Sequence, residues 1–587
     1  MCAESTFPTI DETAVDCVAG TCKNRLTREL VIYGALALVA LLVRLVALGR
    51  WPLMPEEVPT ALAASQALAG QELHSRGYMP LLFDAQLLLL SPQSSPFSAR
   101  LFTATVGSLL VLLPYRARGW LGRYGALAVA AFLALSPTWV YGGRTADGAV
   151  VSIGLGALGL LLLGHAKEAA GARIARAGAG CLGLALASGP QATGMLLVLV
   201  VVGVVWWAHA PTASRDAWRE RWYGSRPATL GVCLLVAWAT VATAGLLNPG
   251  GLGAAVDTVG EWFGRLANPD GVPAYQVPLV LAVYEPLALL LALFAVLRGW
   301  RDRSRLDLGL GVWLLASVLG ATLFGHRGAR WMLCVSLPLT LLAGRAVQLI
   351  VERGLLRLTH RDAIALAASV SLVGFSYVEL GGYLQTMQIT YLVLAAVGAG
   401  VLAAALVGYG VWEGKAEGAR VGAYLALALA LVLTTRGTVA LAYDRARDPW
   451  EPMLYGPTAD TLASLDPFLE HLSLTQAGDP RSAAILYEQA LEPDITWLLR
   501  EYPNARETVR VGAQSGAAIL ISKPREVGAE PQGYVGQSFA LREWRPAESR
   551  SMNDAIKWLL FRQAGPEAVR EKFSVWVRVE PGGGDGE

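Results

Sequence analysis

The sequence predicts a polytopic α-helical membrane protein with about thirteen transmembrane helices and a C-terminal extracytoplasmic α/β domain. Of its 587 residues, 54% are hydrophobic and only 16% are charged, whereas soluble proteins carry about 25% charged residues. The mean hydropathy of +0.45 also excludes a large soluble enzyme. The composition changes near residue 443, after which the chain becomes polar.

Residues 1–29 are predicted to form a cytoplasmic tail, and residues 30–442 the transmembrane domain. The tail is polar, and Lys23, Arg25 and Arg28 stand just before the first hydrophobic run. No small-residue cleavage site follows that run, which indicates a retained anchor rather than a signal peptide.

A transmembrane helix needs about 20 apolar residues. The stretch 176–209 is too long for one straight helix, and Ser188-Gly189-Pro190 interrupts it, so we predict two short crossings there. The other predicted spans lie near residues 30–49, 99–117, 124–142, 147–165, 229–247, 277–298, 305–324, 329–351, 362–382, 390–411 and 420–441.

The distribution of Lys and Arg predicts the orientation in the plasma membrane. With a cytoplasmic N-terminus, the segments on the inner side carry most of the basic residues, for example 215–226, 298–305 and 353–361. Because cytoplasmic loops are enriched in Lys and Arg, this bias supports the orientation. The C-terminal part then lies outside the cell.

Residues 443–587 are predicted to form a separate extracytoplasmic α/β domain. Helix-like stretches occur at 458–473, 495–509 and 552–563. Short β-type runs occur at Ala483–Glu488, Ala517–Ser522 and Phe573–Val579. No G-x-G-x-x-G or P-loop opens any of these helices, so the domain gives no indication of nucleotide binding. No nucleic-acid partner is expected.

An acidic pair, Glu56 and Glu57, follows the first predicted span at its outer end. Two adjacent carboxylates repel each other, which raises the pKa of one of them. Such a group can act as general base towards a hydroxyl or hold a divalent cation. A solvated loop or a helix N-terminus would explain the pair equally well.

Two further clusters of charge are predicted on the outer face. Arg144 and Asp147 follow the third span; Arg144 can bind a phosphate with two hydrogen bonds, oriented by Asp147, or simply pair with it in a tight turn. His326, Arg327 and Arg330 lie at the start of the predicted span 329–351 or just before it. This second cluster suits a phosphate headgroup, and the alternative is an interfacial belt with Trp331.

Weaker candidates complete the set of predicted site residues. Glu285 puts a carboxylate inside a span, as a functional group or as a counter-charge to Arg44 or Arg330. His74 is a supporting candidate, although a lone histidine is more often structural. The loop 248–276, which contains Glu261-Trp262-Phe263, can form an amphipathic segment on the bilayer surface.

These residues, in this order, resemble the GT-C superfamily of integral membrane glycosyltransferases, which includes protein O-mannosyltransferases and lipid A aminoarabinose transferase. The matching features are the acidic pair, Ser98-Ala-Arg100-Leu, Ser136-Pro137 with Arg144, and the arginine-rich turn before Leu337–Gly344. Ala282-Val-Tyr-Glu285-Pro286 and Glu451–Tyr455 are similar to a subgroup described as flippase-activity-associated.

The resemblance implies a transferase that moves a sugar from a polyprenyl-phosphate donor to a protein, glycan or lipid acceptor at the extracytoplasmic face. Glu56 or Glu57 would be the catalytic base, and Glu57 the ligand if a divalent cation such as Mg²⁺ or Mn²⁺ is needed. Arg144, His326, Arg327 and Arg330 would bind the donor phosphate.

Two other kinds of function stay open at this point. The family usually has Asp-Glu where this chain has Glu56-Glu57, and the subgroup Glu-Lys where His326-Arg327 stand. A non-catalytic protein that handles lipid-linked sugars, such as a flippase or its helper, is therefore the alternative. A solute transporter would be expected to show inverted repeats, and none is evident.

Overall fold

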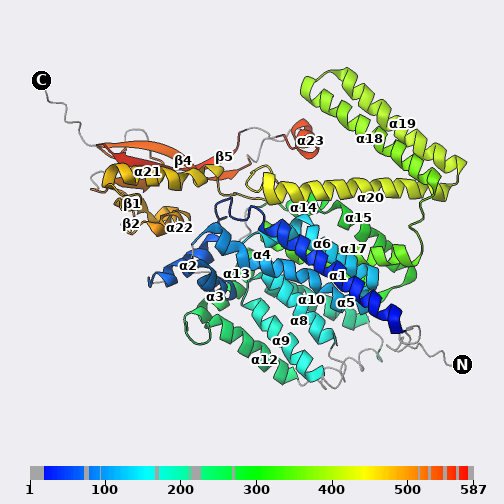
Figure 1. Cartoon of the computed structure of the whole chain (residues 1–587), viewed down its shortest axis with the longest axis horizontal. Helices are drawn as coiled ribbons and strands as arrows, with labels where there is room; N and C mark the ends of the chain where they lie inside the picture. Colours follow the sequence, from blue (N-terminus) through cyan, green and yellow to red (C-terminus); the bar gives the residue numbers. More distant parts are fainter. Residues whose placement is uncertain are drawn as a thin grey trace.

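A computed structural model describes residues 19–579, except for 72–77, 93, 166–170, 210–211, 213–226, 268–271, 513–515, 526–529, 546–551 and 564–566. It shows a large body of packed helices with a small sheet domain at one end (Figure 1). The sheet follows the helices in sequence, as predicted.

The helical body contains these described helices: α1 (Ala19–Leu45), α2 (Val58–Leu68), α3 (Pro80–Leu90), α4 (Pro96–Leu109), α5 (Pro114–Leu121), α6 (Arg123–Leu135), α7 (Pro137–Gly143), α8 (Ala149–His165), α9 (Gly171–Leu186), α10 (Gln191–His209), α12 (Pro227–Ala242), α13 (Gly251–Ala267), α14 (Gln276–Tyr284), α15 (Pro286–Asp302), α16 (Arg305–Leu323), α17 (Met332–Glu352), α18 (His360–Thr386), α19 (Ile389–Trp412) and α20 (Lys415–Val439).

Seven helices within the described residues are long and apolar enough to cross a membrane, or up to nine if each of two bent pairs is one span. The predicted count of thirteen is thus not confirmed. Several expected crossings are shorter apolar helices, including α8 and α12. The predicted break in 176–209 is confirmed, because α9 ends at Leu186 and α10 begins at Gln191.

The two bent pairs meet inside the body. The chain turns by 55° between α6 and α7 and by 100° between α14 and α15. Each break precedes a proline, which lacks an N–H and disfavours helical geometry in the residue before it. Glu285, at the second break, accepts hydrogen bonds from the hydroxyl of Ser136 and from Thr138 N (3.2 Å) at the first. These bonds join the two breaks.

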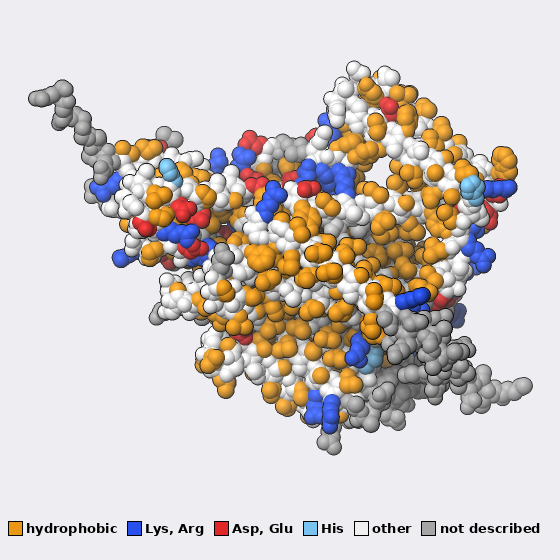
Figure 2. All heavy atoms as spheres, in the orientation of Figure 1, with side chains coloured by type: hydrophobic (Ala, Val, Ile, Leu, Met, Phe, Trp, Pro, Cys, Tyr) orange, Lys and Arg blue, Asp and Glu red, His pale blue; other side chains and the backbone are white. Residues whose placement is uncertain are grey.

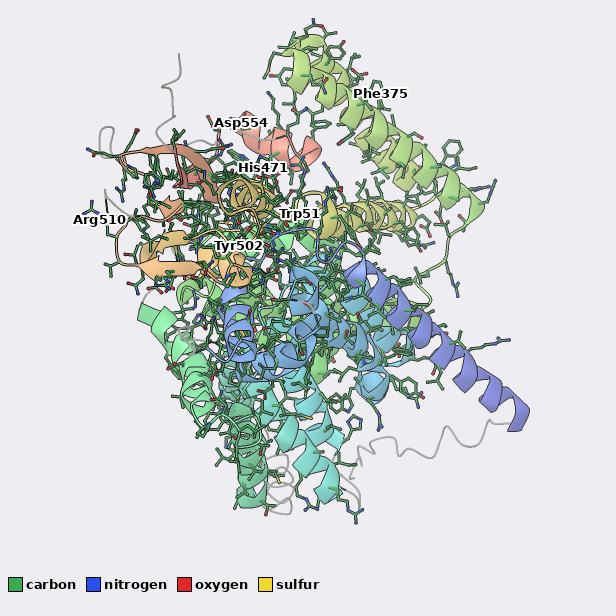
Figure 3. The ribbon with its side chains drawn as sticks, turned by 60° about the vertical axis from the view of Figure 1, so that its left-hand side comes forward. Trp51, Phe375, His471, Tyr502, Arg510 and Asp554 are labelled. Carbon is green, nitrogen blue, oxygen red and sulfur yellow. The ribbon has the colours of Figure 1, made fainter. Side chains whose placement is uncertain are left out.

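The core of the body lies around α17. In its most apolar window, 61% of the residues are buried, against 6% in α18 and 11% in α19. Small residues allow close packing: a Cβ at Gly344 of α17 would lie 2.7 Å from the carbonyl oxygen of Gly125 in α6. The hairpin of α18 and α19, which carries Phe375, projects from the body with its apolar side chains exposed (Figures 1, 2 and 3).

The small domain contains a mixed five-stranded sheet in the order β2-β1-β3-β5-β4. The strands β1 to β3 run parallel, and β5 is antiparallel to both β3 and β4. Its elements are α21 (Leu465–Ala477), β1 (Ile485–Glu488), α22 (Asp494–Leu498), β2 (Ala505–Thr508), β3 (Ile519–Ser522), β4 (Tyr534–Trp544), α23 (Met552–Phe561) and β5 (Val569–Arg578).

The sequence predicted β1, β3 and β5 but missed two strands. The expected helix at 495–509 is wrong in its second half, because α22 ends at Leu498 and β2 begins at Ala505. Pro503 stands between them and cannot continue a helix. The edge strand β4 was missed because its first residues are mostly exposed and lack an apolar alternation.

The small domain docks on the loops at one end of the helical body. Trp497 of α22 is buried in a cluster with Leu53 and Val58. Next to it, Arg500 donates to the hydroxyl (2.9 Å) and carbonyl (2.7 Å) of Ser94. Trp51, on the loop after α1, marks this junction in Figure 3. The loop that carries the acidic pair therefore lies between the two parts of the molecule.

Candidate functional site

Glu57 is fully buried and immediately precedes α2, without capping it. Arg100 of α4 binds both carboxylate oxygens, with Nε–Oε1 and Nη2–Oε2 distances of 2.7 and 2.6 Å. The backbone N–H of Ala146 donates to Oε1 (2.7 Å) and that of Met54 to Oε2 (2.6 Å). A carboxylate accepts about four hydrogen bonds. Glu57 therefore has no acceptor position left for a substrate.

Burial alone would raise the pKa of Glu57, but the charge and hydrogen bonds of Arg100, together with Arg447, bring this pKa below its usual value. The carboxylate stays ionised. It ties the loop after α1 to α4 and to the turn 144–148, which are distant in sequence. Its evident role is to hold the site together.

Glu56, by contrast, is exposed and lines a cavity of about 170 Å³. The cavity lies between the loop after α1, the turn 144–148, α13, the segment before α17 and the segment that leads to the small domain. Its charged lining residues are Glu56, Glu57, Asp147, Arg265 and Arg330, and Tyr141, Thr145 and Tyr455 are among the others.

Asp147 is the second carboxylate of this cavity that can meet a ligand. It is buried, accepts one hydrogen bond from Ala149 N (3.1 Å), and its pKa is raised to about 7, chiefly by burial. The turn that carries it is tightly fixed: Gly148 has a φ of +71°, and a Cβ there would lie 2.2 Å from the carbonyl oxygen of Ser188. A carboxylate with this pKa is suited to exchange a proton near neutral pH.

Two arginines face the cavity from the side of α13. Arg265 of α13 and Arg330 both donate to Oε1 of Glu261, with Arg265 Nη2 at 3.0 Å. Burial alone would raise the pKa of Glu261, and the two arginines bring it below its usual value. Neither Arg265 nor Glu261 was among the predicted site residues. The amphipathic pattern of 248–276 was the signal that could have indicated them.

The predicted phosphate ligands Arg144 and Arg327 are placed differently. Arg144 donates to the carbonyls of Val43, Arg44, Val46 and Ala47 at the end of α1. Arg327 donates to Thr322 at the end of α16 and to Val272. Cations at helix C-termini stabilise the free carbonyls there. Neither side chain lines the cavity.

His326 also stays outside the polar cavity. Its ring stacks on Trp262 at 4.9 Å, meets the edge of Trp331 at 4.6 Å, and bonds to the carbonyl of Trp262 at 3.1 Å. Burial lowers the pKa of His326 to about 4, so the ring is neutral. All three rings line an apolar groove of about 320 Å³ between α10, α16 and α17.

The cavity and the groove share a wall. Trp262 lines the groove and Arg265, one turn later on α13, lines the cavity. In the same way His326 and Trp331 face the groove, while Gly328, Ala329 and Arg330 face the cavity. A charged compartment thus lies directly beside an apolar one.

The remaining predicted residues do not join the cavity. Glu285 bonds to the break between α6 and α7, rather than to Arg44 or Arg330. His74 lies outside the described residues. Within the described residues, no group of three or more His, Cys, Asp or Glu side chains is arranged to hold a metal ion. The oxygens of Glu57 are all engaged, so Glu57 itself offers no position to a divalent cation. A metal requirement stays a prediction.

Comparison with known proteins identifies the fold. No protein-family model matches the sequence, and no curated protein is similar to it in sequence. The structure is similar to that of ArnT from Cupriavidus metallidurans bound to undecaprenyl phosphate, with a TM-score of 0.53 at 18% identity over 84% of this chain and 93% of that chain. This chain has the GT-C fold.

Two further solved structures are similar to this chain to different degrees. ArnT in the apo state gives a TM-score of 0.54 at 18% identity, over 85% of this chain and 94% of that chain. The archaeal oligosaccharyltransferase AglB from Archaeoglobus fulgidus, in complex with an inhibitory peptide and a dolichol-phosphate, gives a TM-score of 0.44 at 11% identity, over 85% of this chain and 70% of that chain. The cavity of this chain lies where the helical body meets the small domain.

Proposed function

We propose that this protein is a membrane glycosyltransferase that moves a sugar from a polyprenyl-phosphate donor to an acceptor hydroxyl at the extracytoplasmic face. The observation that carries the proposal is the shared wall between the charged cavity and the apolar groove. A donor of this class has one long apolar chain and one phosphate, and the two compartments match these parts. The GT-C fold, found in ArnT bound to undecaprenyl phosphate, supports the same class.

In this proposal the donor phosphate lies against Arg265 and Arg330. The isoprenoid chain of the donor lies along Trp262, His326 and Trp331. Arginine forms strong, charge-assisted hydrogen bonds to phosphate oxygens. The aromatic rings and the neutral histidine offer an apolar surface to the isoprenoid chain. Phosphate and tail are thus held on either side of the wall.

The transfer is a single displacement with inversion at the sugar. The acceptor oxygen forms a bond to the anomeric carbon while the bond from that carbon to the phosphate oxygen breaks. The acceptor proton passes to Asp147, and the polyprenyl phosphate leaves with one more negative charge. Arg265 and Arg330 stabilise this charge as it develops, which is often the largest catalytic contribution. In this proposal the acceptor enters beside Glu56, which is exposed and lines the cavity.

Asp147 thus replaces Glu57 as the proposed base. Glu57 is saturated with hydrogen bonds and has a lowered pKa, so it is a poor proton acceptor. Asp147 accepts a hydrogen bond from the N–H of Ala149, and burial raises its pKa to about 7. Glu57 becomes a positioning residue that fixes the turn 144–148 through Ala146.

The test uses full-length protein in lipid nanodiscs and a panel of labelled polyprenyl-phosphate sugars, with release of the polyprenyl phosphate as readout. The wild type should release it from one donor. Asp147→Asn should lose about 100-fold or more of this rate, since general-base catalysis contributes about that much. Asp257→Asn, an exposed acid of α13 that does not line the cavity, is the matched control.

No release from any donor, by folded protein, would contradict the transferase proposal. It would favour a protein that handles lipid-linked sugars without cleaving them. A wild-type rate in Asp147→Asn would leave the reaction intact but remove Asp147 from it.

A further inference from the structure

The contact between Glu261 and the two cavity arginines raises a question that sugar transfer does not answer. Oε1 of Glu261 accepts from Arg330 Nη2 and from Arg265 Nη2 and Nε, the last two at 3.0 and 3.3 Å. One carboxylate oxygen is therefore shared by two guanidinium groups. Both arginines line the cavity, whereas Glu261 itself does not.

The two arginines need an anion between them. Burial, and after it the charge of Arg330, lowers the pKa of Arg265, and like charges in a partly buried site repel strongly. Glu261 of α13 supplies one negative charge. Its side chain is 32% exposed, against 20% for Arg265 and 11% for Arg330, so its own charge can turn to solvent once another anion neutralises the two arginines.

A phosphate offers the two arginines more acceptor oxygens and more negative charge than this one carboxylate oxygen does. It presents several acceptor oxygens, and after the sugar has left it carries nearly two negative charges. Glu261 and a donor phosphate would use the same guanidinium donors, and two anions between the same two arginines would repel each other.

We propose that Glu261 is an internal competitor of the donor phosphate: it holds Arg265 and Arg330 before the donor binds and is displaced when the phosphate arrives. This inference rests on the proposed function. After transfer, the return of Glu261 to the arginines helps to release the polyprenyl phosphate product. Glu261 thus sets the affinity for the lipid phosphate without touching the reacting atoms.

The experiment measures binding of undecaprenyl phosphate to the full-length protein in detergent, with undecaprenol and inorganic phosphate as separate probes. Glu261→Gln should bind undecaprenyl phosphate about threefold to tenfold more tightly than the wild type, as expected for loss of a partly exposed competing charge. Binding of undecaprenol should not change. If inorganic phosphate alone shows the same gain, the site recognises free phosphate as well as lipid phosphate.

Asp257→Asn is the matched control, since it removes an exposed carboxylate from α13 one turn earlier without contacting either arginine in the described structure. Glu261→Asp keeps the charge but shortens its reach by one methylene, and it should give a smaller gain. It also serves as the test if Glu261→Gln does not fold. In turnover, Glu261→Gln should lower both KM for the donor and kcat, because product release slows.

Weaker or unchanged binding of undecaprenyl phosphate by Glu261→Gln and Glu261→Asp would overturn the inference and make Glu261 a support for the arginines. A different result would count against the proposed function instead. This is the case if the wild type binds undecaprenyl phosphate no more tightly than undecaprenol, so that the phosphate is not recognised at all.

Discussion

Glu57 and Asp147 are two buried carboxylates on the wall of one cavity, yet their surroundings are opposite. Glu57 accepts hydrogen bonds at both oxygens from Arg100 and two backbone amides, and these bring its pKa below the usual value. Asp147 accepts one bond from its own turn, and burial raises its pKa to about 7. Residue type therefore says little about function here, and the number of occupied acceptor positions says more.

The arginines show the same contrast. Arg144 and Arg327 give their donors to carbonyls at helix ends, whereas Arg265 and Arg330 share one carboxylate and face the cavity. All four lie at the same end of the helical body. Of these four, Arg265 and Arg330 face the cavity, where a ligand could take the place of Glu261 on their donors.

The largest expected effect is on stability, at Glu57. Glu57→Gln leaves Arg100 buried without its counter-charge, and breaking a buried ion pair in this way costs about 3 to 5 kcal/mol. We expect a clear drop in the thermal midpoint of the purified protein. A variant with wild-type stability that had lost only activity would return Glu57 to the role of catalytic base.

The next effect is the pH dependence that Asp147 brings. A base must be deprotonated to accept a proton, so kcat/KM should rise with pH up to about 7 and then level off. Below this pKa the rate should fall by about tenfold for each unit of pH. The rate of polyprenyl phosphate release between pH 5 and 9 measures this. A flat profile would separate Asp147 from the chemistry.

A smaller effect is expected for the arginines. Arg330→Gln removes one charged donor to the phosphate and should weaken binding of undecaprenyl phosphate by about tenfold, the equivalent of 1.4 kcal/mol. Arg327→Gln changes the same charge three residues earlier but at the end of α16, so it is the matched control. Equal losses in the two variants would indicate a general effect of surface charge.

The smallest effect concerns the docking of the small domain. Arg500 lies over the ring of Trp497 at 4.1 Å and bonds to Ser94. Arg500→Gln should cost about 1 kcal/mol of docking free energy. Limited proteolysis of the segment 445–458 would report this as faster cleavage. Unchanged cleavage would show that Trp497 alone fixes the domain.

The sequence predicted the parts of this molecule that depend on local pattern. The break at Ser188-Gly189-Pro190 is visible because proline and glycine act on the backbone where they stand. The strands β1 and β3 are short apolar runs. The edge strand β4 was not predicted because much of it is exposed, and because its pairing with β5 depends on residues about 35 positions away.

The candidate site was predicted only in part for the same reason. Glu56, Asp147 and Arg330 were recognised as charges at outer helix ends, and they meet in one cavity. Arg144 is also a charge at a predicted outer helix end, but its partners are carbonyls about 100 residues earlier. The link between Glu261 and Arg330 spans 69 residues. Such pairings depend on how helices pack, which a single sequence does not reveal.

The most direct test compares Asp147→Asn with Glu57→Gln in one preparation, by thermal midpoint and by release of polyprenyl phosphate from a labelled donor. We predict that Asp147→Asn keeps or raises the midpoint, since it removes a buried acid with a raised pKa, and loses about 100-fold or more of the rate. For Glu57→Gln, we predict that the main effect is a lower thermal midpoint rather than a lower rate of release. A stable, inactive Glu57→Gln beside an active Asp147→Asn would contradict the division of roles between these two carboxylates.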